Sequence, residues 1–399
     1  MPLSLSQFIN AARWIAALAV LLGHAGVFIN ISDIMVAPHD PGVYVWWFLA
    51  KFWHQAVVVF FVISGFLVGG RVLRRLRRPD RFLGDYMIDR FSRIYIVMVP
   101  VLALGFTIDS LGRSIFPNSG IYDASFFEGV FDPANMLTAL VQQQHIWAAP
   151  AGTNSALWSL ACETWYYVTF PLLLLPLSRA YSKNARLMAF VCGFTAVLVL
   201  SIPNSYFAFG YGIWALGAFV AVARRPLVSS KWLSLLVFIA TATVIRLAAR
   251  GSFVEAHPFI YKLADAATAA TFANVLLTLR FSAEAGFSFC RWPVHQRLSD
   301  FSYSLYASHM PIAFFFWAGT SYVLGKDWEK VLPTPLHWGV GFVLIATALA
   351  VGYGFSILTE ARTDALRKFL RELFARVDRL GARLETPTAR TDEGQVERL

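Results

Sequence analysis

Runs of apolar residues recur along most of the chain, and short polar connections separate them. Each run is long enough for a helix that crosses the hydrocarbon core of a bilayer, which takes roughly 17–25 residues. We therefore expect an all-α fold, a polytopic membrane bundle of about ten helices. The predicted transmembrane helices cover residues 8–29, 44–69, 87–108, 156–177, 187–203, 206–223, 232–250, 257–279, 301–324 and 337–358.

The stretch 187–223 is the hardest to divide, because Pro203, Asn204 and Ser205 interrupt it. It could form two short transmembrane helices, or one helix and a re-entrant segment. Basic residues flank it on both sides, and basic residues favour cytoplasmic loops. Both flanks must then lie on the same side of the membrane, which two crossings allow and one crossing does not.

Composition and charge agree with a membrane protein. Hydrophobic residues make up 57% of the chain and charged residues 15%, whereas a typical soluble domain is about 25% charged. The net charge of +10 comes from basic residues concentrated in alternate connections, and this alternation predicts the orientation of the chain in the membrane. We expect both termini in the cytoplasm, a multi-pass location in the inner (plasma) membrane, and no nucleic-acid partner. The basic stretches are 71–93, 179–186, 224–231, 280–297 and the C-terminal region.

Two segments lie outside the predicted membrane helices. The outer connection 109–155 is rich in Gly, Asn, Asp and aromatic residues, as either a binding loop or an ordinary surface loop would be. After the transmembrane domain, 1–360, apolar residues recur every three or four positions, which predicts a cytoplasmic amphipathic helix over 361–384 on the inner leaflet. We expect 385–399 to be a disordered tail.

Arginine and histidine interrupt the first apolar run, "RWIAALAVLLGH". Arg13 and His24 are eleven residues apart, about three helical turns and ~16 Å, so they share one helix face. Ionisable groups inside a membrane helix usually face the bundle interior and mark a pathway or active site. The structural alternative places Arg13 at the inner headgroups and makes His24 a hydrogen-bonded core residue.

Small residues and arginines end the second run. Ser64 and Gly65 permit close approach of the backbone to a neighbouring helix or to a ligand. The arginines that follow either anchor the helix at the cytoplasmic surface or bind an anionic cytosolic ligand. They are Arg71, Arg74, Arg75, Arg77, Arg78 and Arg81. The third run opens with Arg90 and Arg93 at i, i+3 spacing, which suits the phosphate of a lipid or of a cofactor.

Polar groups also interrupt the fourth and ninth runs. Glu163 follows Trp158 and Ser159 at the depth predicted for His24, so glutamate and histidine could form an acid/base pair or a structural pair. The ninth run carries the side chains Tyr303, Tyr306 and His309 before Pro311. We expect His54, near the outer end of the second run, to be interfacial. Cys162, Cys192 and Cys290 lack metal-like or disulfide-like spacing, so we expect no metal site.

Five motifs stand in order along residues 8–358: arginine, ten residues and histidine, then "FFVISGF", "RFSRIY", "WSLACETWYY" and "SYSLYASHMP". Together they resemble the membrane-bound acyltransferase family 3, of the O-antigen and exopolysaccharide acetyltransferase type. Ile96, Ala307 and Ser308 depart from the family pattern, which puts local packing in doubt more than chemistry. Besides the residues named above, the motifs match Phe60, Phe61, Phe66, Tyr95, Leu160, Tyr167 and Ser302.

The resemblance implies an O-acetyltransferase that moves an acyl group, acetyl first, from cytosolic acyl-CoA to a hydroxyl of an extracytoplasmic glycan or glycolipid. Acetyl-CoA would be a substrate, and no cofactor would be permanently bound. His24, oriented by Glu163, would act as general base or carry the acyl group, with Arg13 stabilising negative charge.

The other candidate residues would support this reaction. Trp158 and Ser159 would shape the site, and the Ser64-Gly65 break would admit the thioester arm of the donor. Side chains that would bind substrate or support the site are Tyr303, Tyr306 and His309. Side chains that would bind the CoA phosphates are Arg71, Arg74, Arg75, Arg90 and Arg93.

Two alternatives stay open. The same ionisable residues could line a path in a non-enzymatic transporter or lipid-binding membrane protein, although the internal repeats common in transporters are not visible. The donor could also be succinyl-CoA within the same enzyme class. Nothing in 109–155 specifies the acceptor.

Overall fold

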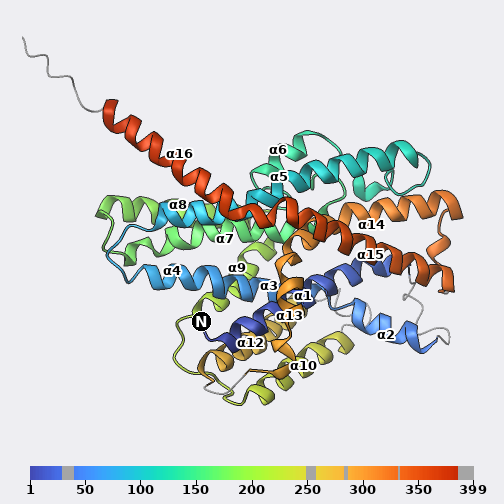
Figure 1. The fold of residues 1–399 in the computed structure, drawn as a ribbon, viewed down its shortest axis with the longest axis horizontal. Coiled ribbons are helices and arrows are strands. Elements are labelled where there is room, and N and C mark those ends of the chain that lie inside the picture. The colour runs from blue at the N-terminus through green and yellow to red at the C-terminus, as the bar shows by residue number, and fades with distance from the viewer. Residues whose placement is uncertain (29–39, 249–257, 283–285, 331–332, 385–399) are drawn as a thin grey trace, which may run out of the picture.

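The computed structural model describes residues 1–28, 40–248, 258–282, 286–330 and 333–384 (Figure 1). Within these ranges the regular structure is helical, and the strand-like pairing is limited to one isolated bridge between Gln144 and Ala148. The predicted all-α polytopic bundle is confirmed.

Ten long helices overlap the ten predicted transmembrane helices one by one. Among the described residues, seven helical segments are long and apolar enough to cross a membrane, and Ser205–Val220 is a shorter apolar helix. The ten helices are α1 (Leu3–Ala25), α3 (Trp53–Ser64), α5 (Leu83–Ile115), α7 (Trp158–Leu174), α8 (Lys183–Ser201), α9 (Ser205–Val220), α10 (Lys231–Ala248), α12 (Pro258–Phe281), α14 (Ser302–Leu324) and α15 (Pro335–Leu358).

Helix α1 lies near the centre of the bundle, between α5 on one side and α10 and α12 on the other (Figure 1). It packs directly on α3 and α14, and α14 packs in turn on α5 and α15. Helices from the two ends of the chain are therefore neighbours in space. The stretch 187–223 forms two helices as predicted, and the Asn204 side chain caps α9 by accepting a hydrogen bond from the Tyr206 amide.

The second predicted helix, 44–69, is not continuous. It consists of α2 (Pro41–Ala50), α3, a π-helical turn (Gly65–Gly69) and α4 (Gly70–Arg75). The π turn crosses α9 at very short range, since a Cβ atom on Gly65 would lie 1.8 Å from the backbone oxygen of Trp214. Of the two roles left open for Gly65, close packing against a neighbouring helix is the one that the structure supports.

Replacing Gly65 with alanine should therefore damage the fold. Overpacking a tight contact costs about 1–3 kcal/mol, and here the clashing atom is backbone, which has little freedom to move. We expect a lower yield of monodisperse protein and a lower melting temperature in detergent. Gly212→Ala on α9 is the matched control, because a Cβ there meets nothing within 4 Å. Equal behaviour of the two variants would contradict the packing role.

The outer connection packs back onto the bundle. Helix α5 runs to Ile115, beyond the predicted end at 108, so Asp109 lies on a helix and is buried. Its carboxylate accepts hydrogen bonds from the amide and hydroxyl of Thr153, at 2.9 and 2.7 Å. The connection itself contains one short α-helix, α6 (Ala134–Leu140), and the expectation that the connection begins at residue 109 was wrong, whereas its outer location stays a prediction.

His54, which we expect at the membrane interface, has partners within the bundle. It is buried, and its Nε2 lies 2.9 Å from the carboxylate of Asp265 on α12. The same oxygen accepts a hydrogen bond from the hydroxyl of Tyr206 on α9, at 2.9 Å. This network joins α3, α9 and α12, and the apolar pattern gave no reason to expect a partner for His54.

The predicted amphipathic segment is helical as α16 (Thr363–Leu384), the long red helix in Figure 1. Its first turns pack on α5. There Arg367 and Arg371 lie 2.9 and 3.1 Å from one carboxylate oxygen of Asp89. Contact with the inner leaflet and the domain boundaries stay predictions, and the tail predicted over 385–399 lies outside the described residues.

Candidate active site

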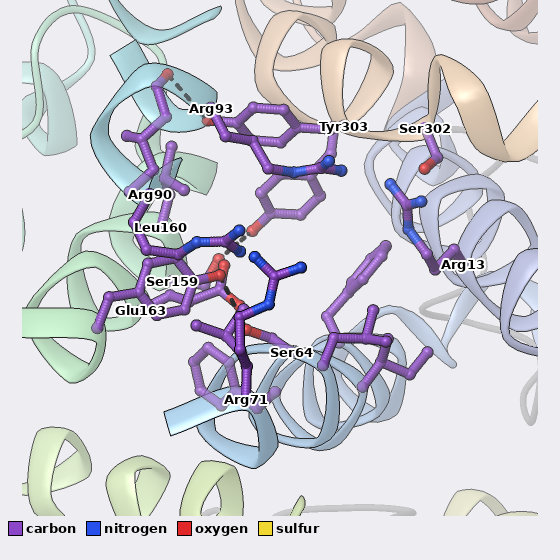
Figure 2. A pocket seen from close by; sticks show the side chains of 18 residues that line it. Arg13, Ser64, Arg71, Arg90, Arg93, Ser159, Leu160, Glu163, Ser302 and Tyr303 are labelled. Atoms are coloured by element: carbon purple, nitrogen blue, oxygen red, sulfur yellow. Dashed lines mark hydrogen bonds between the residues drawn. The ribbon is translucent and has the colours of Figure 1, made fainter. Parts of the chain in front are cut away.

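A cavity of about 350 Å³ opens between α1, α3, α4, α5, α7 and α14 (Figure 2). Its apolar wall comes mainly from the second helical run, and its polar groups come from all six of these helices. The polar lining residues are Arg13, Ser64, Arg71, Arg90, Arg93, Ser159, Glu163, Tyr167, Ser302, Tyr303 and Tyr306.

Three arginine side chains converge on one end of the cavity. Arg90 and Arg93, one turn apart on α5, point toward the space that Arg71 of α4 also reaches (Figure 2). Arg71 has an exposed ion pair with Asp89 at 3.1 Å. The Nε of Arg90 is buried and has no hydrogen-bond partner among the described residues. Buried polar groups are nearly always paired in native proteins, so this end of the cavity is suited to an anionic ligand.

Glu163 is the only carboxyl group among the described residues that line the cavity. It lies beside the hydroxyls of Ser64 and Tyr167, and the charges of Arg93 and Arg13 act on it. The Ser64 hydroxyl is fixed from two sides, 2.9 Å from the Tyr167 hydroxyl and 3.0 Å from the Trp214 indole nitrogen that donates to it. Glu163 and the hydroxyls of Ser64 and Tyr167 therefore form one polar part of the cavity wall.

His24 of α1 and His309 of α14 form a hydrogen-bonded pair. Nδ1 of His24 lies 2.9 Å from Nε2 of His309, and Nδ1 of His309 lies 2.7 Å from the backbone oxygen of Tyr306. A carbonyl oxygen can only accept, so Nδ1 of His309 carries the hydrogen. In the neutral ring its Nε2 then accepts from Nδ1 of His24. The lone pair of His24 is therefore on Nε2, available for a proton or an acyl group.

The expected pairing of His24 with Glu163 was wrong. Glu163 lines the arginine cavity, and neither histidine is one of the described residues that do so. Their separation has a simple cause: α1 packs against α3 and α14, so the side chain at the depth of His24 across that contact is His309. Similar depth in the membrane does not make two helices neighbours.

Tyr306 connects the cavity to the histidine pair. It lines the cavity, and its ring centroid lies 5.9 Å from that of His309, one helical turn further along α14. Its hydroxyl donates to the Ala156 carbonyl at 2.7 Å and lies 2.6 Å from the Ser159 hydroxyl. Helix α1 makes a second connection from the cavity to the histidine pair. Arg13 lines the cavity, and His24 lies ~16 Å further along the same helix.

Pro311 affects the same stretch of α14. Because proline has no amide hydrogen, the Ala307 carbonyl one turn earlier lacks its helical partner. The Asn154 side chain, from the outer connection, donates to that carbonyl at 2.8 Å. The outer connection thereby holds α14 next to His309.

Four other predicted site residues are not among the described residues that line the cavity. Trp158 packs on the rings of Phe61 and Tyr206 instead. Gly65 contacts α9, and Arg75 pairs with Asp80 at 2.7 Å on the surface. The fourth is Arg74, whose guanidinium lies near those of Arg280 and Arg71. Binding of CoA by Gly65, Arg74 or Arg75 has no support in this geometry.

Sequence reasoning missed one charged group at the site. The carboxylate of Glu360 lies 3.9 Å from Arg93 and accepts a hydrogen bond from the Ser304 hydroxyl at 3.1 Å. It follows α15, at an end of the bundle that the charge pattern predicts to be cytoplasmic and rich in basic residues. The sequence feature that could have identified Glu360 is an acidic side chain at a position where basic residues are favoured.

The chain is similar in sequence to known proteins. A family profile described as an acyltransferase domain matches residues 6–355. Over 165 residues the chain is 29% identical to "Acyltransferase MdmB" of Streptomyces mycarofaciens, which covers 41% of this chain and 38% of that protein. Over 131 residues it is 31% identical to an uncharacterized protein of Haemophilus influenzae, which covers 31% of this chain and 49% of that protein.

These alignments span less than half of either relative. No solved structure matched the chain. The profile, by contrast, covers the bundle from α1 to α15 and includes every residue that lines the cavity. The chain belongs to acyltransferase family 3.

Proposed function

We propose that this acyltransferase moves an acyl group, acetyl first, from cytosolic acyl-CoA to a hydroxyl of an extracytoplasmic glycan or glycolipid. The observation that carries the proposal is the arrangement along α1 and α14. Both helices lead from a cavity with four arginines to a histidine pair in which the neutral rings leave the lone pair of His24 on Nε2. An anionic donor and a base for a hydroxyl acceptor would thus meet in one bundle.

The cavity would bind the donor. Arginine guanidinium groups match phosphate geometry with paired hydrogen bonds, and Arg71, Arg90 and Arg93 converge at one end. Charge patterning places this end on the cytosolic side, where acyl-CoA is available. The apolar wall around Phe60 and Phe61 would accommodate the thioester arm.

His24 would act on the acceptor. Its Nε2 takes the proton of the acceptor hydroxyl while the hydroxyl oxygen attacks the thioester carbonyl, and the proton then leaves with the CoA thiolate when the C–S bond breaks. The same lone pair would serve a two-step route in which His24 carries the acyl group. Arg13, on the cavity side of His24, would stabilise negative charge along the path from the cavity to His24.

A thermal-shift titration of purified protein in detergent tests the donor. We expect acetyl-CoA to raise the melting temperature with saturation, because a ligand at 100 times its Kd stabilises the folded state by about 2.7 kcal/mol. Succinyl-CoA in a parallel titration separates the two donors. No shift with acetyl-CoA, succinyl-CoA or free CoA at millimolar concentration would remove the donor proposal and favour a non-enzymatic role.

The acceptor is tested by mass spectrometry of surface glycans from cells with and without the protein. We expect an acyl ester that disappears with the gene and returns with the wild-type chain. Identical glycans from the two strains would contradict a glycan acceptor, even if the donor binds.

A further inference from the structure

Glu360 is a buried carboxylate that the proposed reaction does not use. It begins a short 3₁₀ turn, Glu360–Arg362, between α15 and α16. Its side chain is 11% exposed, whereas that of its partner Arg93 is 45% exposed. The charge of Arg13 also acts on it. Arg93 lines the cavity, whereas Glu360 is not one of the described residues that do so.

The ion pair leaves Arg93 free to change partner. One nitrogen of Arg93 lies 3.9 Å from one oxygen of Glu360, which is longer than a normal hydrogen bond and is not a paired contact. Glu360 itself is held, because the Ser304 hydroxyl donates to its other oxygen at 3.1 Å. Arg93, with a half-exposed side chain and a long contact to Glu360, therefore lies between a hydrogen-bonded carboxylate and the cavity that it lines.

Asp89 is different. One of its oxygens pairs with Arg71, while the other pairs with Arg367 and Arg371 of α16. If Arg71 turns to a ligand, two arginines still compensate Asp89. Glu360 has a single close ion-pair partner among the described residues, so it competes more strongly for that partner.

Competition between Glu360 and a phosphate for Arg93 would help the release of the product. If the donor is acyl-CoA, the product CoA keeps every phosphate, so arginines that bind the donor hold the product equally well. A fixed carboxylate that takes back one arginine lowers the affinity for both and shortens the residence of CoA. We infer that Glu360 is a resident counter-ion that competes with the phosphates of CoA for Arg93 and speeds CoA release. This inference rests on the proposed donor.

Free CoA is the probe, because its binding needs neither acceptor nor turnover. Glu360→Gln removes the charge and keeps an oxygen that can accept from Ser304. We expect the Kd of CoA to fall about fivefold at low salt, since partly exposed ion pairs are weak, and the difference to shrink at high salt. The inhibition constant of CoA as a product should fall by the same factor.

Two further variants keep the result interpretable. Glu372→Gln removes an exposed acidic charge from α16 and should leave the Kd of CoA unchanged. If Glu360→Gln fails to fold, Glu360→Asp withdraws the carboxylate from Arg93 and should also tighten CoA binding. Melting temperatures without CoA show whether each variant is folded.

The outcomes separate this inference from the proposed function. If the wild type binds CoA and Glu360→Gln binds it equally or more weakly, the counter-ion role is wrong and the donor proposal stands. If the wild type does not bind CoA, both are wrong. Tighter binding by Glu360→Gln, lost at high salt, supports the competition.

Discussion

Replacing His24 with alanine is expected to lower acyl transfer at least ~100-fold and to leave the Kd of CoA within about twofold. The first effect follows from the loss of the general base or acyl carrier, since a positioned base contributes about 10²–10⁴-fold. The second follows because His24 is outside the set of described residues that line the arginine cavity. Steady-state kinetics in native membranes and CoA titration of purified protein measure the two effects separately.

His309 should behave as a positioning residue. His309→Ala removes the acceptor that holds the hydrogen on Nδ1 of His24, so turnover should fall, although less than in His24→Ala. His309→Gln keeps an oxygen that can accept this hydrogen and should recover part of the activity. If His24→Ala is folded and retains normal turnover, the histidine pair is not the catalytic centre.

Replacing Arg90 with alanine is expected to raise the KM for acyl-CoA about 10- to 100-fold with a much smaller change in kcat. Hydrogen bonds to charged groups contribute about 1.5–3 kcal/mol, and the buried Nε of Arg90 has no hydrogen-bond partner among the described residues. Loss of binding in the ground and transition states alike raises KM and leaves kcat largely unchanged.

Arg75→Ala is the matched control. Arg75 belongs to the same basic stretch, 71–93, but it pairs with Asp80 on the surface and does not belong to the described lining of the cavity. Its KM should stay within about twofold of wild type. Equal losses in Arg75→Ala and Arg90→Ala would show that general surface charge, rather than this cavity, attracts the donor.

The helices of this fold could be predicted from sequence because each one is a long apolar run. The π-helical turn in the second run could not be predicted, nor could the close contact of Gly65 with the backbone of Trp214, about 150 positions away. Asp109 was misplaced for a similar reason. A charged residue near the end of an apolar run is normally assigned to a loop. The hydrogen bonds from Thr153 that allow Asp109 to be buried on a helix depend on the folded structure.

For the candidate site, sequence supplied most of the residues but not their partners. Helical spacing correctly put Arg90 and Arg93 on one face, and it placed His24 beyond Arg13 along α1. Depth could not distinguish Glu163 from His309 as the neighbour of His24, because a sequence gives position along a helix and not which helices touch. Glu360 was missed because its role depends on α15 ending beside Arg93.

Sided membrane vesicles from the native cell test the central claim most directly. Acyl-CoA labelled in its acyl group is added outside inside-out vesicles, whose exposed face is cytoplasmic, and outside right-side-out vesicles. We predict base-labile label in material on the opposite face of inside-out vesicles only, its loss in His24→Ala, and its retention in Arg75→Ala. Equal label from either face, or from vesicles that lack the protein, would contradict transfer from a cytosolic donor site to an outer acceptor.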